Sequence, residues 1–306
     1  MATTLASQNI EQVDLKVKDA FNTGAKGYLS QYENVFIVET PERKDERFVI
    51  VQTDSGVSEV ADGAAYPTQD ISEIGANQIT QKVYKSAIPI GDLADLFDNY
   101  KAIERTAQTR GYHFKAKTDA LCAAFLNNAT STTAPYGINI NGTTYALNGT
   151  TQAIGKTGTT QSNRQTGSLD KSTLNSARVL MRKMKDHDGM IANYQARRLV
   201  VPAEETMNAW QITKSAGEPE SANRNDNYIN SLGLSIIEWP LLTSTTACWL
   251  MADKSDVGAK GLRLEVKEMP TVRRILHPDT GCWNYQFRMV LQPGVIDYMG
   301  IVSIGL

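Results

Sequence analysis

The sequence predicts an α+β protein in which strands and helices follow one another without a regular βαβ alternation. Two stretches carry this prediction: residues 39–82 have the pattern of a long polar hairpin, and the strand-like residues 82–90 lead directly into one long helix. The strands and helices predicted after this helix follow no regular order, and the last two predicted elements are strands. A chain of 306 residues is long enough for one large domain or for two lobes with their own cores.

Residues 1–30 are polar and contain one weakly amphipathic helix. Its apolar face is formed by Ile10, Val13, Val17 and Phe21. Gly24 and Gly27 follow as residues that commonly end a helix. We interpret this segment as an arm that docks on a neighbouring surface, and the apolar residues 35–38 predict a short buried strand after it.

The hairpin predicted over residues 39–82 has a polar tip. A charged cluster at residues 42–47 precedes the apolar run 48–51, and a crest rich in Gly, Asp, Ser and Ala follows. A hairpin of this length with so few apolar positions cannot bury much of its own surface. It therefore either docks on another chain or lies as a loop over its own domain.

The long helix predicted over residues 102–127 would span roughly 40 Å at 1.5 Å per residue. Apolar and small residues recur before and along it at nearly heptad spacing, at Leu93, Leu96, Tyr100, Ile103, Ala107, Phe114, Leu121 and Phe125. Gly111 in its middle indicates a bend or a close contact. A long helix with a single narrow apolar face is typical of a flat, elongated subunit, although an ordinary helix that crosses a protein core has the same periodicity.

The second half of the chain mixes short strands and helices. Asn141-Gly142 between two short apolar runs predicts a tight hairpin, and residues 149–167 are predicted to be a flexible surface loop. Asp170 or Ser168 caps a helix that runs to Lys185. Pro202 opens a further helix, and strands are predicted at residues 198–201, 234–238, 248–251, 262–266, 283–291 and 295–304.

Composition excludes several classes of protein. The net charge is −2 and the pI is near 6.0, which disfavours a nucleic-acid partner held mainly by phosphate contacts. No apolar run approaches the length of a membrane-spanning helix, and the N-terminus lacks the pattern of a secretory signal. Cys122, Cys248 and Cys282 are odd in number and form no CxxC pair, so we expect buried, reduced thiols of a cytosolic protein.

No constellation of residues in the sequence indicates catalysis or a cofactor. The three histidines, His113, His187 and His277, lie far apart, and His113 is expected on the surface. Residues 186–189 could hold a cation, but a solvated turn that ends a helix is the more ordinary interpretation. The tryptophans are predicted to lie in the core, at Trp210, Trp239, Trp249 and Trp283.

The ordered set of these parts resembles the major capsid proteins of tailed bacteriophages, which share the Hong Kong 97-type, or Johnson, coat fold. The hairpin at 39–82 resembles the extended E-loop, and residues 83–90 followed by 93–126 resemble the P-domain strand and the spine helix. Residues 197–202 and 249–253 resemble strands that lead into the A-domain. Within the family, the length and the Ser30-Gln31-Tyr32 segment are most similar to Mu-type head proteins.

The resemblance implies a division of the chain into five regions. They are an N-terminal arm (1–34), the E-loop hairpin with its flanking strand (35–82), the P-domain strand, spine helix and inserted loop (83–170), a mainly A-domain block (171–265) and C-terminal strands that return to the P-domain (266–306). It also implies a non-enzymatic coat protein, without cofactor or metal, that forms hexamers and pentamers of an icosahedral head around double-stranded DNA. The expected location is the virion, after assembly in the bacterial cytoplasm, and no membrane partner is expected.

Further partners follow from the same resemblance. A separate scaffolding protein is implied because the chain has no large N-terminal block that could act as one, and a portal and a decoration protein are also expected. Contacts between subunits are expected from the hairpin, at Arg43, Lys44, Asp45, Glu46, Arg47, Tyr66 and Pro67. Some family members crosslink an E-loop lysine to an asparagine, for which Lys44 and Asn284 are the nearest candidates, but no base is evident.

The basic residues of the long helix allow two interpretations. Arg105, Arg110, Lys115 and Lys117 could face packaged DNA, or they could form an ordinary solvated helix face. Two other functions compete with that of a phage coat. An encapsulin-type compartment would have the same fold and a protein cargo, and a soluble enzyme would require a cleft with titratable groups.

Overall fold

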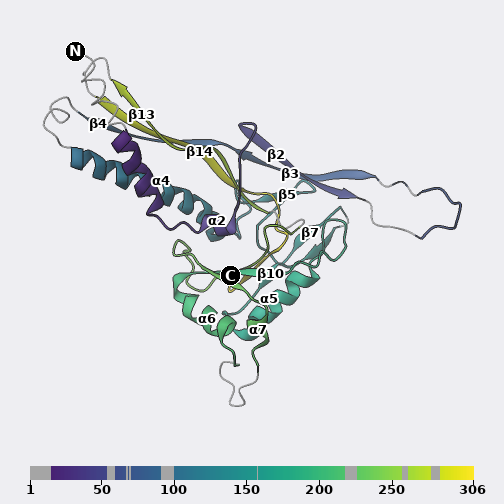
Figure 1. Cartoon of the computed structure of the whole chain (residues 1–306). Helices are drawn as coiled ribbons and strands as arrows, with labels where there is room; N and C mark the ends of the chain where they lie inside the picture. The colour runs from purple at the N-terminus through teal and green to yellow at the C-terminus, as the bar shows by residue number, and fades with distance from the viewer. Residues whose placement is uncertain are drawn as a thin grey trace, which may run out of the picture.

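The computed structural model describes residues 15–53, 59–66, 68, 70–90, 100–156, 158–217, 226–256, 261–276 and 283–306. The molecule is elongated (Figure 1): a long sheet with two helices forms one end, a helix-covered lobe lies below its middle, and a hairpin extends to the opposite side. The predicted α+β class is confirmed. Strands and helices do not alternate regularly along the chain.

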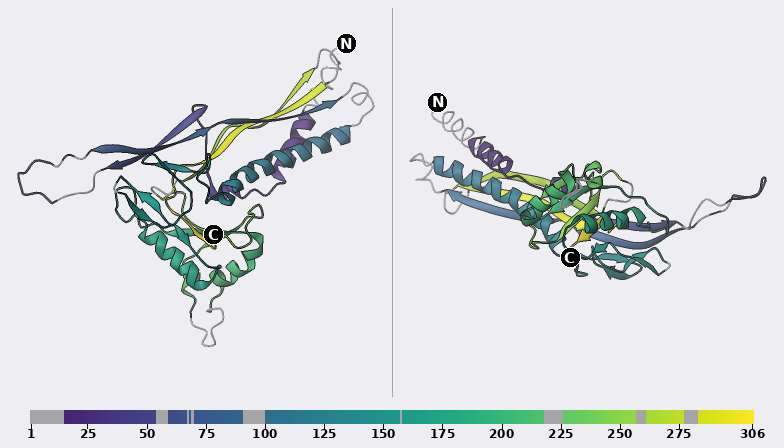
Figure 2. Two further views of the ribbon diagram at one scale, coloured as in Figure 1. Left: turned by 180° about the vertical axis from the view of Figure 1, so that it is seen from behind. Right: turned by 90° about the horizontal axis from the view of Figure 1, so that it is seen from below.

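The long sheet has the strand order β1-β13-β14-β4, with β1 parallel to β13 and the other pairs antiparallel. Its strands are β1 (Ile37–Glu39), β13 (Leu262–Leu276), β14 (Trp283–Val295) and β4 (Lys82–Ile90). The helical residues 15–26 and α4 (Tyr100–Asn127) cover one face of this sheet (Figure 2). Phe21, Phe114 and Phe287 meet there, with the rings of Phe21 and Phe287 stacked at 5.1 Å.

The long helix is confirmed as α4, and Ala107, Phe114 and Phe125 of its predicted stripe are buried. Leu93 and Leu96 lie outside the described residues. Gly111 marks a close contact, because a Cβ atom there would lie 2.0 Å from the carbonyl oxygen of Phe21. The chain therefore crosses itself at backbone distance where the N-terminal helix passes over α4.

The expectation that Gly24 ends the N-terminal helix is wrong. The helix continues to residue 26, and a Cβ atom on Gly24 would lie 1.9 Å from the carbonyl oxygen of Gln108 in α4. Gly24 is thus a packing glycine and Gly27 follows the helix end, where its N–H bonds the Thr23 carbonyl. The strand expected at residues 35–38 is also shifted, since α2 (Tyr32–Val35) is a helical turn and the strand begins at Ile37.

The predicted hairpin is confirmed as β2 (Asp45–Thr53) paired antiparallel with β3 (Ile71–Thr80). A register shift between Ile50 and Val51 interrupts the pairing. The two strands form their own two-stranded sheet and project from the body as an arm (Figure 1). Residues 54–58 of the predicted crest lie outside the described residues.

The tight hairpin predicted at Asn141-Gly142 is confirmed between β5 (Ile138–Ile140) and β6 (Thr143–Tyr145), with φ of 53° and 72° at the two turn residues. The flexible loop expected at residues 149–167 is wrong. That segment contains the short strands β7 (Gln152–Ile154), β8 (Thr159–Gln161) and β9 (Arg164–Gln165). The segment is polar, and polar segments are usually exposed loops. Asn163 is nevertheless buried, because its side-chain amide donates hydrogen bonds to the Leu147 and Ile301 carbonyls.

The lower lobe contains a sheet in the order β11-β10-β12-β15-β9. Its strands besides β9 are β10 (Ala196–Val201), β11 (Ser235–Glu238), β12 (Cys248–Ala252) and β15 (Ile301–Ile304). The helical elements are α5 (Lys171–Lys183), η1 (Ala203–Glu205), α6 (Thr206–Lys214) and α7 (Tyr228–Ser231). Asp170 caps α5 as predicted, since its carboxylate accepts the Thr173 N–H at 2.7 Å.

The tryptophans do not share one environment. Trp239 and Trp249 are buried as predicted, but the prediction for Trp210 is wrong because 59% of its surface is exposed on α6. This short helix buries its opposite side through Ala209 and Ile212, which leaves Trp210 outside. Trp283 is half-buried in β14, where the guanidinium of Arg274 lies 3.6 Å from its ring centre.

Candidate assembly surfaces

The root of the hairpin holds the charged residues expected to contact other subunits. The Glu46 carboxylate accepts the backbone N–H groups of Glu42 and Arg43 at 2.7 and 2.8 Å, and these bonds lower the pKa of Glu46. Arg47 forms an ion pair with Glu73 across the two strands. These bonds shape the root of the arm, while Arg43, Lys44 and Asp45 keep exposed side chains.

The far part of the hairpin exposes apolar as well as polar residues. Tyr66 is 94% exposed, and Val49, Val51 and Ile71 are exposed on the strands. Pro67, the remaining contact residue expected from the sequence, lies outside the described residues. The arm is bonded to its own body at Thr53 and Gln52, and exposed apolar side chains of this kind commonly mark an interaction surface.

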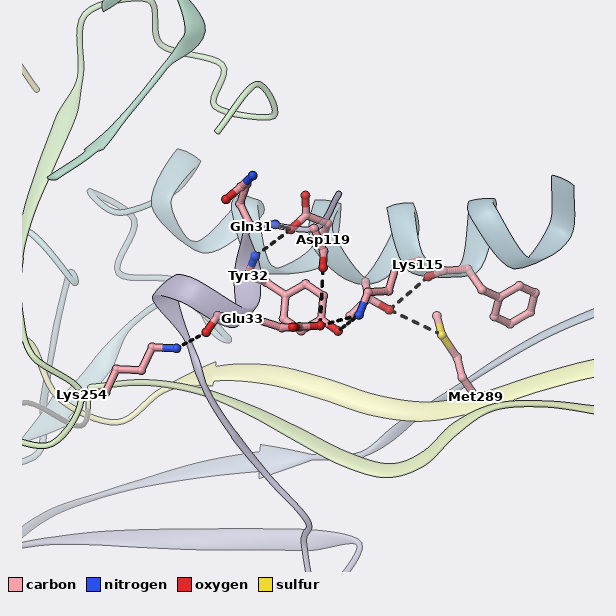
Figure 3. A network of polar contacts seen from close by, with 10 residues as sticks. Gln31, Tyr32, Glu33, Lys115, Asp119, Lys254 and Met289 are labelled. Carbon is pink, nitrogen blue, oxygen red and sulfur yellow. Dashed lines mark hydrogen bonds and ion pairs between the residues drawn. The ribbon is translucent and has the colours of Figure 1, made fainter. Parts of the chain in front are cut away.

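A buried carboxylate joins the N-terminal segment to α4, as Figure 3 shows, and it also binds Trp239 of the lower lobe. Asp119 is 1% exposed and accepts four hydrogen bonds. The donors are the N–H groups of Gln31 and Tyr32 at 3.0 and 2.9 Å, the Tyr28 hydroxyl at 3.1 Å and the Trp239 indole at 3.1 Å. A buried charge requires this degree of hydrogen bonding, so Asp119 fixes the three segments relative to one another.

Lys115 lies one turn before Asp119 and contacts the same segment. Its ammonium is 2.5 Å from the Glu33 carboxylate and 2.7 Å from the Tyr32 hydroxyl, as Figure 3 shows for Glu33. The hydrogen bond from Lys115 lowers the pKa of Glu33. Of the four basic residues proposed for the DNA-facing surface, Lys115 therefore already has an internal counter-charge.

Two cations bind the carbonyl end of α2 from the opposite side. Lys254 donates to the carbonyl groups of Glu33 and Phe36, and Arg198 donates to those of Asn34 and Val35. Cations are favourable where the last carbonyl groups of a helix are unpaired. Burial and the neighbouring charge of Arg198 lower the pKa of Lys254 to about 8.

The anchoring roles of Asp119, Lys254 and Arg198 were not predicted from the sequence. Asp119 gives one signal in retrospect, since it is an acid on the side of α4 that also carries the buried residues Phe114 and Cys122. Lys254 and Arg198 give none, because their roles depend on carbonyl groups far away in the chain. Tyr28 and Glu33 likewise become recognisable only through their partners, and Trp239 was predicted to be buried but not to bind a carboxylate.

The helix layer on the long sheet is basic on its solvent side. Arg105 and Lys117 are exposed and Arg110 is half-buried, and further exposed cations in the two helices are Lys16, Lys18, Lys26 and Lys101. Asp19 and Glu104 are the acids with solvent access in the same described helical residues. Arg105, Arg110 and His113 line a shallow hollow of about 300 Å³ on α4. A local positive field thus exists on a chain whose net charge is −2.

The turn at residues 186–189 is a tertiary junction, so the expectation of a solvated turn is wrong. His187 is 9% exposed and its Nε2 atom lies 2.9 Å from the Asp297 carboxylate. Asp188 accepts the backbone N–H and hydroxyl of Thr53 at the end of β2. The turn therefore ties the hairpin to the chain segment between β14 and β15.

Burial disfavours a charged His187, but the hydrogen bond and charge of Asp297 outweigh burial, and the net effect raises the pKa of His187. The prediction for His113 is confirmed, since this residue is exposed on α4. His277 lies outside the described residues. Asp186 also faces His187 and adds to the rise in its pKa.

Cys122 and Cys248 are buried, as expected. Burial raises the pKa of Cys122 well above its usual value and that of Cys248 to about 12, so both thiols stay protonated at neutral pH. Cys282 lies outside the described residues. In the part of the chain that the structure describes, no helix is long and apolar enough to span a bilayer, and no three His, Cys, Asp or Glu side chains gather as a metal site.

Comparisons with known proteins agree with this architecture. Residues 76–304 match the family model described as phage capsid protein. The fold is similar to the capsid of an empty GTA particle (TM-score 0.55, 14% identity, 91% of each chain) and to Mycobacterium phage Adephagia (TM-score 0.55, 11% identity, 91% and 90%). It is also similar to the capsid of cyanophage P-SCSP1u (TM-score 0.53, 10% identity, 90% and 88%). No curated protein sequence matches the chain.

Proposed function

Because the chain belongs to the phage capsid protein family, we propose that copies of it assemble into hexamers and pentamers of an icosahedral head that encloses double-stranded DNA. The observation that carries this proposal is the family match over residues 76–304, on a chain with the Hong Kong 97-type coat fold of tailed-phage capsids. The family makes it a capsid protein. The capsomer composition and the DNA content are the further steps that we propose.

The hairpin supports assembly from many weak contacts. We place the intersubunit contacts at Arg43, Lys44, Asp45, Glu46, Arg47, Tyr66 and Pro67. Exposed ion pairs contribute only about 0–1 kcal/mol each, so a misplaced subunit can leave before the shell closes. Repetition of the same contacts in a closed shell then makes the assembly stable.

We propose that the helix layer faces the packaged DNA. The exposed cations on α4 and on the N-terminal helix support this orientation, with Arg105, Arg110 and Lys117 as the principal phosphate-facing groups. Lys115 contributes less directly, because Glu33 and Tyr32 hold its ammonium. A positive surface on a chain of net charge −2 would offset phosphate charge without gripping the DNA strongly.

The five regions expected from the sequence remain our proposed division. The N-terminal arm (1–34) and the C-terminal strands (266–306) lie against the P-domain, and the block 171–265 forms most of the A-domain. Asp119 of the spine helix supports this division, because its carboxylate binds Gln31 of the arm and Trp239 of the A-domain block. The two domains would then be held at a fixed angle by a small polar cluster.

The remaining partners follow from the role of a coat protein. We propose that the protein acts without catalysis, within the virion, after assembly in the bacterial cytoplasm on a separate scaffolding protein. A portal would occupy one vertex, and a decoration protein would bind the finished surface. In this proposal the scaffolding protein would control the size of the head, the portal would admit the DNA, and the decoration protein would reinforce the shell.

Negative-stain electron microscopy tests the function directly. The full chain is expressed alone and together with its genomic neighbours, and the particles are purified before and after nuclease treatment. Closed shells or hexameric capsomers are expected, and shells from the coexpression should protect double-stranded DNA. Shells filled with protein and free of DNA would instead indicate an encapsulin-type compartment, and a uniform monomer or dimer under every condition would overturn the capsid proposal.

A further inference from the structure

One buried acid lies in the middle of the long sheet. Glu265 on β13 is 2% exposed, and among the described residues its Oε2 atom has no hydrogen-bond partner. An acid is almost never fully buried unless a partner group or a proton neutralises it. The groups around Glu265 therefore decide whether it can carry a charge.

Glu265 belongs to a row of four polar side chains that crosses the sheet. It stands opposite Glu39 of β1 and Gln292 of β14. Gln81 comes directly before β4, whose first residue pairs with the neighbour of Gln292, so Gln81 lies at the end of the same row. Residues that stand opposite one another share one face of a sheet, so these four side chains are neighbours.

The two amides of this row do not neutralise Glu265. Gln81 and Gln292 are 7% and 6% exposed, and in the described part of the chain their Oε1 atoms accept no hydrogen bond. A carboxylate only accepts hydrogen bonds, whereas a protonated carboxyl group donates one. A proton on Glu265 would remove the buried charge and add a donor to a row of oxygens that lack one.

The root of the hairpin (residues 41–48) covers this face of the sheet. Arg263 lies two residues before Glu265 and therefore on the same face. Its guanidinium lies 4.7 Å from the ring centre of Phe48 at the root. Lys267, two residues after Glu265, donates to the Pro41 carbonyl at 3.0 Å. The root is thus seated on the part of β13 that holds Glu265.

The charged groups that face Glu265 come from three strands. Glu46 of β2 and Glu39 of β1 are acids, and Arg263 of β13 is a cation that already forms an ion pair with Glu39. Lys267, also on β13, lies near Glu46. Burial and the charges of Glu46 and Glu39 raise the pKa of Glu265, and Arg263 offsets only part of this rise.

We propose that Glu265 is a proton switch: its carboxyl group is protonated while the root of the hairpin is seated on the long sheet, and loss of the proton loosens the root. Ionisation would place a negative charge between Glu46 on the arm and Glu39 on the sheet, where like charges repel. Strand β13 is paired on both sides at Glu265, so the sheet resists this repulsion and the arm moves. The switch belongs to the single subunit and does not depend on assembly.

The stability of the unassembled full chain tests the switch. Because folding raises the pKa of Glu265, the folded state keeps its proton over a pH range in which the unfolded state has lost it. Glu265 should therefore not affect stability below about pH 4.3, where the unfolded glutamate is protonated as well. Its contribution should lower stability as the pH rises from there through the folded-state pKa.

Glu265→Gln is the direct test, because glutamine is neutral at every pH and keeps an N–H donor. Chemical denaturation from about pH 4 to 8 gives the unfolding constant of each protein. The two constants should be similar at the acid end. At pH 8 that of the variant should be smaller, by about tenfold for each unit between the folded and unfolded pKa values. A ratio that is constant with pH, or a variant less stable than the wild type at pH 8, would overturn the proposal.

Glu46→Gln tests the switch without changing Glu265. The Oε1 atom of Glu46 accepts both backbone N–H groups at the root, so an amide can keep these bonds. Without the charge of Glu46, the decline in stability should end at a lower pH. Glu42→Gln, at an exposed acid of the same root, is the control and should leave the profile unchanged. A Glu46→Gln profile identical to that of the wild type would show that no repulsion acts between the arm and the sheet.

Limited proteolysis identifies the part of the molecule that loosens. Trypsin at pH 8 should cut after Arg43, Lys44 and Arg47 several-fold more slowly in Glu265→Gln than in the wild type. Cleavage after Lys183, exposed at the end of α5, should change less. Mass spectrometry of the fragments measures both rates, and circular dichroism shows that each variant is folded. Equal slowing at the root and at Lys183 would indicate a global effect and overturn the local switch.

Discussion

The indole N–H of Trp239 donates a hydrogen bond of 3.1 Å to the buried carboxylate of Asp119, and this bond joins the lower lobe to the long helix α4. The same carboxylate binds Tyr28 and the backbone of residues 31 and 32. One side chain therefore connects three parts of the chain that are 87 or more residues apart in sequence. Its removal should loosen all of them at once.

The first prediction concerns Asp119→Asn. The amide keeps one acceptor oxygen and places an NH₂ group among four donors, so the free energy of unfolding should fall by about 2–4 kcal/mol. Chemical denaturation measures this decrease, and limited proteolysis should cut the N-terminal segment faster. Asp226→Asn, at an exposed position, should change neither quantity. Unchanged stability and protection in Asp119→Asn would show that Asp119 does not anchor these segments.

The second prediction concerns the crossing of the N-terminal helix over α4. A Cβ atom on Gly111 would lie 2.0 Å from the Phe21 carbonyl oxygen, so Gly111→Ala should destabilise the protein by about 1–3 kcal/mol, although alanine favours helix formation. Thermal unfolding measures the change. Gly27→Ala is the control, because the nearest atoms lie 3.4 Å or more from its Cβ position. A more stable Gly111→Ala variant would show that the two backbones separate freely.

The third prediction concerns pH. The raised pKa of His187 means that the folded state binds a proton more tightly than the unfolded state. The junction should therefore contribute its full stability below about pH 6.5 and lose it as the pH rises through the folded-state pKa. Thermal unfolding from pH 5 to 9 measures this decrease in stability.

His187→Gln serves as the comparison for the pH prediction, because glutamine offers an N–H to Asp297 and does not titrate. Its unfolding temperature should fall less over the same pH range. Identical pH profiles for the two proteins would exclude His187 as the titrating group. Asp186, Asp188 and Asp297 remain in both proteins, so the comparison isolates the loss of the imidazole.

The fourth prediction concerns DNA. The triple variant Arg105→Gln, Arg110→Gln and Lys117→Gln should weaken binding of capsomers to non-specific double-stranded DNA. The slope of log K against log salt concentration should fall by about 3, because each of the three removed cations would otherwise neutralise one phosphate group. Fluorescence anisotropy at several salt concentrations measures the slope.

Two controls make the DNA prediction specific to the helix layer. Arg273→Gln with Lys85→Gln removes exposed charges from the long sheet and should leave the slope unchanged. Lys115→Gln should affect the stability of the N-terminal segment more than DNA binding, because its ammonium already binds Glu33. If the Arg273→Gln, Lys85→Gln variant lowers the slope and the triple variant does not, the DNA lies against the long sheet and not against the helix layer.

Much of the fold could be predicted because short runs of neighbouring residues specify many of its elements. The hairpin, the strand at 82–90, the long helix, the Asn141-Gly142 turn and the Asp170 cap each follow from a short run of residues. Gly111 was also interpretable as a close contact. The packing role of Gly24 was not, because a glycine near a helix end resembles a stop signal whether or not a second backbone lies against it.

The incorrect predictions for residues 149–167 and 186–189 have the same physical cause. Both segments are polar, and polar segments are usually exposed. Here Asn163 and His187 can be buried because groups distant in the sequence form hydrogen bonds with their side chains. These groups are the Ile301 carbonyl and the Asp297 carboxylate. Trp210 is the opposite case, an apolar residue left outside because its short helix buries another side.

The sequence by itself determined the class of fold, the order of the elements, the projecting arm and the resemblance to a phage coat, because periodicity and turn chemistry act over a few residues. Only the tertiary structure decided which polar side chains hold the parts together. Asp119 is hydrogen-bonded to Gln31, 88 residues away in the sequence, and to Trp239, 120 residues away. Arg198 is hydrogen-bonded to Asn34, 164 residues away. The partner of a buried polar group is set by the position of distant backbone in space, which no local pattern encodes.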